Sequence, residues 1–357
     1  MTDKYSILFF GASYGSLLGA KAALAGHSAH LICLPDESQL INSEGAILRL
    51  PVRDVPDGPV VLNTKDMPGV VSAGRPEDAD PSGYDLIVLA MQEPQYRVPA
   101  VKDLLSRVGA SGRPCMSIMN MPPLSFLRRI PAVDGGAVRG CYTDASVWDN
   151  VDPSLITLCS PDPQAFRPPE EKCNVLQVGL PTNFKAARFE SDDHTAILRK
   201  LEEDIQRIRY SVVGKEVELP VKLRVHDSVF VPLAKWCMLL AGNYRCVQAK
   251  EMIPIREAVH TNLDASESLY NWVADLCVSL GGDHADLVPF EKYAKAALSL
   301  QKPSSAARAL VAKAPYIERV DKLVQALAES QGMQSDEVDR IVELVDGWLA
   351  RNREEAA

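Results

Sequence analysis

The first 34 residues contain the pattern that most restricts the possible folds: a strand, a glycine-containing turn, a helix and a second strand. An apolar run over residues 5–10 ends at Gly11, and an apolar repeat with helical spacing over residues 16–24 ends before Gly26. A second apolar run follows over residues 29–34. Short runs without polar alternation are typical of parallel strands that are buried on both faces. The chain therefore opens with a predicted βαβ unit.

The same alternation continues through the first third of the chain. Residues 84–90 and 114–119 form two more apolar runs, with a helical pattern near residues 99–108 between them. Strands that alternate with helices predict a doubly wound α/β sheet. Between about residues 133 and 190 the apolar pieces become short and are separated by proline-containing turns. We expect this stretch to be an enlarged, partly antiparallel region of the first domain.

From about residue 191 the spacing of apolar residues becomes helical. The length of 357 residues suits two domains, and we place them at residues 1–218, which should bind a dinucleotide, and at residues 219–357, which should be all-helical. The predicted helices cover residues 196–208, 229–247, 255–279, 289–300, 304–314, 317–330 and 335–351.

Composition narrows the class of protein further. The formal net charge of −9 disfavours a nucleic-acid-binding surface. No apolar run approaches the roughly 18 residues of a membrane helix, and the first residues lack the pattern of a signal peptide. The eight cysteines include no C-x-x-C pair, which argues against a zinc or other metal site. We therefore expect a soluble cytoplasmic protein with no membrane or nucleic-acid partner and a small-molecule substrate.

The turn after the first strand resembles a degenerate dinucleotide fingerprint. A complete fingerprint has three glycines, for a tight turn, for close approach to the pyrophosphate and for helix packing. Here Gly11 occupies the first position, and Ser13 and Ser16 occupy the other two, with Tyr14 and Gly15 between them. Small residues at the start of a helix leave N–H groups facing outward for phosphate. The alternative is that the glycines serve only the turn and the packing.

An acidic residue follows the second strand. Asp36, with Glu37 after it, lies near the position where a carboxylate accepts hydrogen bonds from the adenosine ribose. An acidic residue at this position favours NAD over NADP as the cofactor. Asp36 could equally be the N-cap of the next helix.

Four stretches of the chain resemble the ketopantoate reductase (2-dehydropantoate 2-reductase) family, and the resemblance extends over most of the chain apart from its enlarged middle. Residues 40–48 resemble the segment after the second strand, and residues 84–92 resemble a strand that usually ends at a lysine. Residues 119–121 resemble the Gln-Asn-Gly of the family. Lys235, Trp236 and Asn243 match a lysine and a later asparagine on one long helix.

Membership would imply a Rossmann domain that binds NADP(H), a helical second domain, a homodimer and hydride transfer to a 2-oxo acid. By the same resemblance Lys235 would be the catalytic proton donor and Asn120 would lie beside the nicotinamide. Asn243 would bind substrate together with Ser304 or Ser305, and Glu318 is the nearest candidate for the glutamate of the family. Gln92 stands in the position of the usual cofactor-side lysine.

Several residues depart from the family pattern at positions that bear on the choice of substrate. Leu239 replaces a midway asparagine, Met121 replaces a glycine, and the phosphate loop has lost two glycines. We therefore expect a 2-oxo acid other than ketopantoate. Loss of a buried asparagine that reads a hydroxyl would cost roughly 1–3 kcal/mol of recognition.

Each of these candidates also has a purely structural interpretation. Lys235 could extend from an amphipathic helix to water, Asn243 could bond a neighbouring carbonyl, and Glu318 could pair with Lys322 at i,i+4. Two other functions also fit the pattern. One is an opine-type dehydrogenase that acts on an imine, and the other is a dinucleotide-binding sensor without catalysis.

Overall fold

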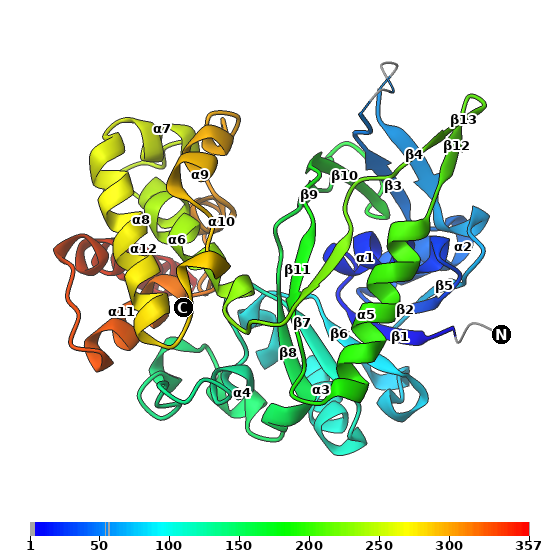
Figure 1. Ribbon diagram of the computed structural model, residues 1–357, viewed down its shortest axis with the longest axis horizontal. Helices are drawn as coiled ribbons and strands as arrows, with labels where there is room; N and C mark the ends of the chain where they lie inside the picture. The colour runs from blue at the N-terminus through cyan, green and yellow to red at the C-terminus, as the bar shows by residue number, and fades with distance from the viewer. Residues whose placement is uncertain (1–3, 54, 56–57, 357) are drawn as a thin grey trace. The chain divides into compact units, whose positions relative to one another are not determined.

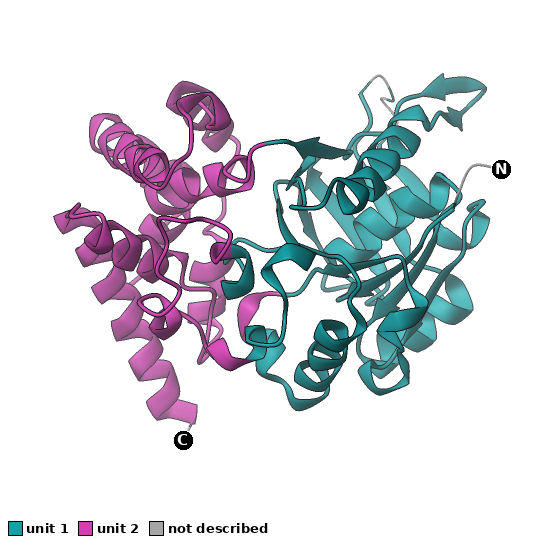
Figure 2. Ribbon diagram, turned by 60° about the horizontal axis from the view of Figure 1, so that its bottom comes forward, with its two compact units in different colours: residues 1–91, 95–126, 147–227 teal, residues 92–94, 127–146, 228–357 magenta. Residues whose placement is uncertain are grey.

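The computed structural model describes residues 4–53, 55 and 58–356. The chain forms two compact units, which are coloured separately in Figure 2. Unit 1 consists of Met1–Met91, Gln95–Phe126 and Val147–Asp227, and unit 2 consists of Gln92–Pro94, Leu127–Ser146 and Ser228–Ala357.

These units differ from the division expected at residues 218 and 219. Strand β14 (Leu223–His226) pairs with β11 (Phe184–Ala187) in the sheet of unit 1, so the chain leaves this unit only after Asp227. Two internal segments, Gln92–Pro94 and Leu127–Ser146, belong to unit 2 although strands of unit 1 surround them in the sequence. No local pattern in these segments indicates that assignment.

Unit 1 is built on an eight-stranded sheet with the order β14-β11-β8-β7-β6-β1-β2-β5 (Figure 1). The six strands from β8 to β5 are all parallel, whereas β11 is antiparallel to β8. Their sequential order corresponds to that of a doubly wound dinucleotide-binding fold, which confirms the predicted fold class. The bounds of these six strands are β1 (Ser6–Phe10), β2 (Ser28–Ile32), β5 (Val71–Gly74), β6 (Leu86–Leu89), β7 (Cys115–Ile118) and β8 (Ile156–Ser160).

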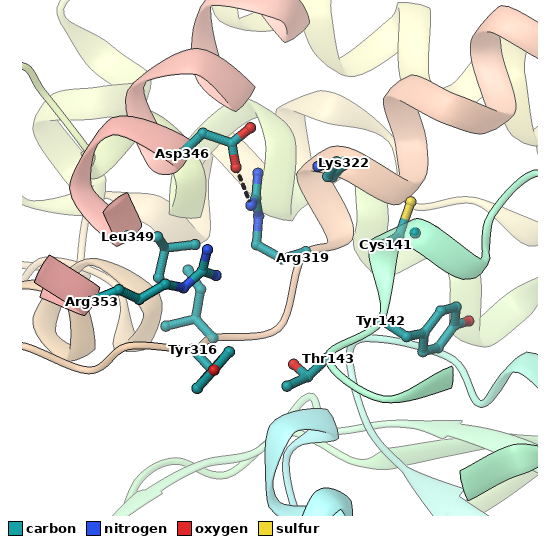
Figure 3. A pocket seen from close by; sticks show the side chains of 11 residues that line it. Cys141, Tyr142, Thr143, Tyr316, Arg319, Lys322, Asp346, Leu349 and Arg353 are labelled. Carbon is teal, nitrogen blue, oxygen red and sulfur yellow. Dashed lines mark hydrogen bonds and ion pairs between the residues drawn. The ribbon is translucent and has the colours of Figure 1, made fainter. Parts of the chain in front are cut away.

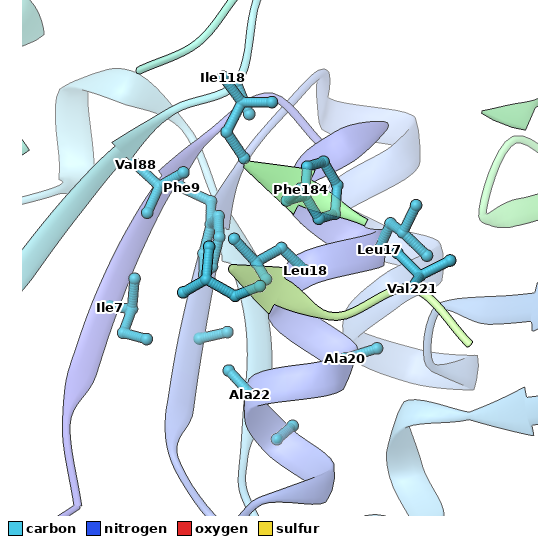
Figure 4. Close-up of a cluster of buried hydrophobic side chains, with 14 of the residues drawn as sticks. Ile7, Phe9, Leu17, Leu18, Ala20, Ala22, Val88, Ile118, Phe184 and Val221 are labelled. Carbon is cyan, nitrogen blue, oxygen red and sulfur yellow. The ribbon is translucent and has the colours of Figure 1, made fainter. Parts of the chain in front are cut away.

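The core of unit 1 lies between this sheet and its helices. Phe9 on β1 and Leu17 on α1 are completely buried, and Phe184 on β11 packs into the same cluster (Figure 4). Burial of one such side chain contributes roughly 1.5–3 kcal/mol. The helices of unit 1 are α1 (Tyr14–Leu24), α2 (Pro35–Glu44), α3 (Pro99–Ser111), α4 (Leu124–Leu127) and α5 (Asp192–Arg207).

A second, four-stranded sheet joins two distant parts of unit 1. Its order is β4-β3-β10-β9, with β3 parallel to β10 and the two outer pairs antiparallel. The strands are β3 (Ile47–Leu50), β4 (Val60–Asn63), β9 (Gln164–Phe166) and β10 (Val175–Leu180). The Arg49–Glu171 ion pair joins β3 to the β9–β10 connection, and the hydrogen bond from Asn174 Nδ2 to the Gly45 carbonyl (2.7 Å) joins that connection to the end of α2. A separate hairpin consists of β12 (Tyr210–Val212) and β13 (Lys215–Val217).

The regular elements that the structure describes in unit 2 are helical. They are α6 (Lys235–Met238), α7 (Ile255–His260), α8 (Leu263–Ser279), α9 (Phe290–Ala297), α10 (Ser305–Val311), α11 (Val320–Ser330) and α12 (Asp336–Ala356). The single helix expected over residues 255–279 is two helices, because the Asn262 side chain accepts the Ala265 N–H (3.1 Å) and begins α8.

Among the residues described, no helix has the length and apolar character needed to cross a lipid bilayer.

Candidate functional site

The turn after β1 has the geometry that a dinucleotide-binding loop requires. Gly11 has φ +92°, and its N–H donates to the Ile32 carbonyl (2.8 Å). A Cβ atom at Gly11 would lie 3.0 Å from the Ala90 carbonyl oxygen, at the end of β6. Gly11 thus lies where the strand order reverses, between β1 and its neighbours β2 and β6. Ligands bind at this point in open α/β sheets.

Gly15 has the packing role that the sequence pattern gave to Ser16. A Cβ atom at Gly15 would lie 3.2 Å from the Cβ atom of Phe9, so glycine at this position lets α1 pack closely on β1. Ser16 is buried next to it. Gly11 thus forms the turn and Gly15 allows the close packing of α1, as the structural interpretation expected. Phosphate binding remains compatible with these roles, because a tight turn and close helix packing are both parts of the dinucleotide fingerprint.

Helix α1 presents its first turn without a side-chain cap. Ser13 is the N-cap residue, and its hydroxyl makes no capping hydrogen bond. The first N–H groups of a helix lack intrahelical partners, and together with the helix dipole they favour phosphate. The Tyr14 hydroxyl donates to the Pro163 carbonyl (3.1 Å), and its ring packs edge-on against Phe184. The connection between β8 and β9 therefore fixes Tyr14 at the start of α1.

The acidic residue that the structure fixes after β2 is Glu37, and Asp36 is exposed. The Glu37 carboxylate is buried and forms an ion pair with Arg167, the residue that follows β9. Burial raises the pKa of Glu37, and the positive charge of Arg167 opposes that rise. The side chain of Glu37 is 7% exposed and that of Arg167 is 34% exposed, so an approaching ligand meets mainly the guanidinium.

Gln92 and Asn120 follow the neighbouring parallel strands β6 and β7. Gln92 is exposed and Asn120 is half-buried. The residue after Gln92, which the sequence patterns did not single out, is more tightly held. The Glu93 carboxylate accepts hydrogen bonds from the Thr143 backbone N–H (3.0 Å) and from the Thr143 hydroxyl (2.9 Å). Burial raises the pKa of Glu93, with the Thr143 hydrogen bonds opposing the rise.

Lys235 is half-buried and begins helix α6 of unit 2. The long helix expected over residues 229–247 is irregular, because a π-turn over Leu239–Asn243 follows α6. In a regular α-helix, eight residues are 2.2 turns, which would place Lys235 and Asn243 about 80° apart around the axis. A π-turn inserts one extra residue, so the two side chains come to within about 20° of one helix face.

Tyr293 and Gly242 account for the π-turn. The Tyr293 hydroxyl donates to the Met238 carbonyl (3.1 Å) at the point where the turn begins. A Cβ atom at Gly242 would lie only 1.9 Å from that hydroxyl oxygen. Glycine is therefore required at this position for Tyr293 to reach the helix backbone. Turns of this kind occur frequently at functional sites.

Ser304 belongs to the same part of unit 2 as Asn243. Its hydroxyl donates to the Asn243 carbonyl (2.7 Å) and accepts the Ala307 N–H (3.1 Å), so Ser304 is the N-cap of α10. Ser305 is exposed. Of the two serines left open by the sequence, Ser304 is thus the structural one, and the Ser305 hydroxyl is the more accessible to a ligand.

Tyr244 joins Glu318 to the end of the π-turn. The Tyr244 hydroxyl donates to the Glu318 carbonyl (2.5 Å) and accepts the Val320 N–H (3.0 Å). Burial raises the pKa of Tyr244 well above its ordinary value, so the hydroxyl keeps its proton. The buried Glu318 carboxylate accepts the Glu93 N–H (3.4 Å). Lys322 forms no ion pair with Glu318 among the described residues, so the expected i,i+4 pair is absent there.

The structure therefore arranges the predicted residues in two groups. Gly11, Ser13, Tyr14, Gly15 and Ser16 surround one end of α1 in unit 1. In unit 2, Asn243, Ser304 and Glu318 are linked through hydrogen bonds of the Ser304 and Tyr244 hydroxyls. The first group can hold a diphosphate. The second offers amide and carboxylate groups for a small polar molecule, and Lys235 on α6 belongs to the same unit.

Comparison with known proteins supports this fold. No protein-family model and no curated protein sequence matches the chain. Solved structures do match over nearly the whole length. A ketopantoate reductase of the PanE/ApbA family from Ralstonia eutropha JMP134 is 14% identical, with 98% of this chain and 99% of that chain covered and a TM-score of 0.62.

Two further structures share the fold at the same low identity. A D-mandelate dehydrogenase, solved with NADH and anilino(oxo)acetate, is 12% identical over 98% of this chain and 99% of its own, with a TM-score of 0.64. A dimeric ketopantoate reductase from Staphylococcus aureus is 10% identical over 97% and 99%, with a TM-score of 0.57. The chain thus has the fold of ketopantoate reductases along its whole length.

Proposed function

We propose that this chain is a nicotinamide-dependent reductase that converts a small 2-oxo acid into the corresponding 2-hydroxy acid. The observation that carries the proposal is the full-length fold shared with ketopantoate reductases and with a D-mandelate dehydrogenase solved with NADH and anilino(oxo)acetate. A helix start fit for diphosphate at the reversal of strand order adds to it, since this is where such cofactors bind.

The proposed cofactor residues lie in unit 1, except Gln92, which belongs to unit 2. The N–H groups at the start of α1, from Ser13 to Ser16, would hold the diphosphate, and the conformation of Gly11 keeps the turn clear of side chain. Asn120 and Gln92, which follow β7 and β6, would face the nicotinamide half. When bound, the reduced nicotinamide supplies the hydride.

We infer that Arg167 reads the adenosine end of the cofactor. Its guanidinium is the accessible member of the pair with Glu37, and it lies beside the first turn of α2. An arginine in this region accommodates a 2′-phosphate, whereas a carboxylate accepts the 2′-hydroxyl. Because Glu37 is buried and already paired, we propose that NADPH is preferred over NADH.

Lys235 would supply the proton that completes the reaction. Hydride addition to the carbonyl carbon leaves negative charge on its oxygen, and transfer of a proton from the Lys235 ammonium gives the alcohol. Asn243, which the π-turn brings to the same helix face, would donate a hydrogen bond to the substrate. Ser305 and Glu318 are the further substrate-binding candidates.

The proposed substrate is a 2-oxo acid other than ketopantoate. Leu239 is buried within the π-turn, between Lys235 and Asn243 in the sequence. Its apolar side chain can pack against carbon atoms of a substrate but cannot form a hydrogen bond with a substrate hydroxyl. Burial of a hydroxyl without a partner costs about 1–3 kcal/mol, so a substrate with an apolar group at this position is favoured.

The decisive experiment follows the absorbance of NADPH or NADH during incubation with a panel of 2-oxo acids, with and without amines. Oxidation with an oxo acid alone would support the proposal. Oxidation only in the presence of an amine would indicate an opine-type dehydrogenase. A change in cofactor fluorescence without oxidation under any of these conditions would indicate a sensor and overturn the reductase assignment.

We also propose that the protein acts as a homodimer in the cytoplasm. A dimeric ketopantoate reductase shares its fold over 97% of this chain. Light scattering of the purified protein should give about twice the chain mass of 39.0 kDa. A mass of one chain across the concentration range would contradict the proposal.

A further inference from the structure

Unit 2 contains a cavity that none of the predicted site residues lines. It has a volume of about 310 Å³, and its walls come from the segment Gly140–Thr143, from residues 316–322 and from α12 (Figure 3). Three of its side chains are cationic, namely Arg319, Lys322 and Arg353, whereas Asp346 is its one carboxylate. The volume is at the lower end of the range for small-molecule sites.

The Arg319 side chain forms a fixed wall of this cavity. Its Nε and Nη2 atoms donate to the Asp321 carboxylate (3.0 Å and 2.9 Å), and Nη1 donates to Asp346. Asp321 is completely buried. Asp321 and Asp346 thus both pair with Arg319, and neither forms an ion pair with Lys322 or Arg353 among the described residues.

Lys322 and Arg353 are the other two cations of this cavity. Among the residues described, neither has a carboxylate partner within ion-pair distance. Arg353 donates Nε to the Pro315 carbonyl (3.0 Å) and lies over the Tyr316 ring at 5.1 Å, which leaves its two terminal nitrogens available. In Figure 3 the Arg319 side chain lies between Arg353 and Lys322.

The remaining walls are neutral. Ile317 and Leu349 are buried apolar side chains. Burial raises the pKa of the Cys141 thiol to about 11, although Lys322 and Arg319 oppose the rise, so this thiol is uncharged at neutral pH. The cavity therefore combines two separate cations with two apolar side chains.

We propose that this cavity binds a short dicarboxylate, with one carboxylate on Lys322, the other on the terminal nitrogens of Arg353, and the carbon chain against Ile317 and Leu349. A bidentate guanidinium contact and an ammonium contact are both strong recognition elements for carboxylates. This ligand differs from the substrate of the proposed reaction, because the residues assigned to that reaction lie outside the cavity.

Isothermal titration of the whole protein with succinate, at constant ionic strength and without nicotinamide cofactor, tests this proposal. Butyrate has the same carbon chain with one carboxylate, and we expect it to bind at least tenfold more weakly. Lys322→Met and Arg353→Gln should each weaken succinate binding at least tenfold, whereas Lys322→Arg should keep most of it. Lys292→Met, which removes an exposed lysine on α9, should leave succinate binding unchanged.

Equal affinity for succinate and butyrate would overturn the proposal, and so would an unchanged affinity in both charge-removing variants. Saturable binding of inorganic phosphate with no binding of succinate would overturn the dicarboxylate assignment. The melting temperature of each variant without ligand separates lost binding from lost folding. Since no cofactor or turnover is involved, failure here is distinct from failure of the proposed reductase activity.

Discussion

At the scale of single residues, Lys235 is the most direct test of the proposed chemistry. Replacement by alanine removes the proposed proton donor but no residue of the α1 loop, which lies in unit 1. We expect kcat to fall by a factor of about 10²–10⁴, the usual contribution of general acid catalysis, with little change in NADPH affinity. Steady-state kinetics and a fluorescence titration of NADPH measure the two quantities. Normal turnover of Lys235→Ala would remove this residue from the mechanism.

Replacement of Arg167 tests the proposed preference for NADPH over NADH. If its guanidinium contacts the 2′-phosphate, Arg167→Ala should lower the ratio of kcat/KM for NADPH to that for NADH by roughly 10- to 100-fold, the worth of a charge-assisted hydrogen bond. Arg49→Ala is the matched control, because Arg49 also forms an ion pair in the four-stranded sheet, but with Glu171. An unchanged ratio in Arg167→Ala would show that the cofactor does not reach this arginine.

The candidate residues at the start of α1 can be predicted from the sequence. The residues with which the other candidates form ion pairs and hydrogen bonds cannot. Gly11 is predictable as the first glycine of the fingerprint, because that prediction needs only its position directly after the first strand of a βαβ unit. The choice of Asp36 over Glu37 missed the ion pair, because Arg167 is 130 residues away from Glu37 in the sequence. Ser304 and Ser305 are likewise indistinguishable in the sequence, because the Asn243 carbonyl that accepts from Ser304 is 61 residues away.

At the scale of elements, the π-turn after α6 depends on one glycine. Gly242→Ala should destabilise the protein by roughly 1–3 kcal/mol, the usual cost of overpacking, because its Cβ atom would overlap the Tyr293 hydroxyl. Gly347→Ala on α12 has open space around its Cβ position and should be neutral or stabilising by up to about 1 kcal/mol. Urea unfolding compares the two variants. Equal stabilities would mean that Tyr293 does not hold the turn.

A buried lysine gives helix α1 a pH-dependent contribution to stability. Lys21 donates to the Pro220 carbonyl (3.1 Å), and burial, with a smaller effect of Lys222, lowers its pKa from 10.5 to about 7. Between pH 7 and 10.5 the unfolded lysine binds a proton that the folded one does not. In that window stability should therefore rise with pH, by at most roughly 1.4 kcal/mol per unit. Below about pH 7 both states are protonated and the contribution is constant.

Lys21→Met should abolish this dependence. The difference in unfolding free energy between the wild-type protein and the variant, measured in urea at pH 7, 8 and 9, should increase with pH in favour of the wild type. Lys250→Met, which removes an exposed lysine of unit 2, serves as the control and should show no such slope. A flat difference for Lys21→Met would mean that this lysine stays protonated when folded.

Four of the eight strands of the central sheet, β1, β2, β6 and β7, are predictable from the sequence because their mainly apolar character is local. The four-stranded sheet was not predicted, since β10 pairs with β3 across more than a hundred residues. The π-turn was also missed, because its cause is the Tyr293 hydroxyl on another helix. Local patterns thus predict these four strands, whereas contacts between residues far apart in the sequence determine the four-stranded sheet and the π-turn.

At the scale of the whole molecule, the two proposed ligands should act on different units. Hydrogen exchange with NADPH should protect the start of α1 and the end of β2, which belong to unit 1. Succinate should instead protect Gly140–Thr143 and the start of α11, which belong to unit 2. Mass spectrometry of peptides from the two regions measures this. Protection of the unit 2 peptides by NADPH and not by succinate would contradict the separate site.

The pairing of β3 with β10 also has a consequence for synthesis on the ribosome. The β3–β4 hairpin is complete at Asn63, about 110 residues before Val175 begins its partner strand. At the usual pace of translation this is a delay on the order of ten seconds. During that interval the nascent hairpin exposes an unpaired strand edge, so chaperone demand in the cell should fall sharply once β10 has emerged from the exit tunnel.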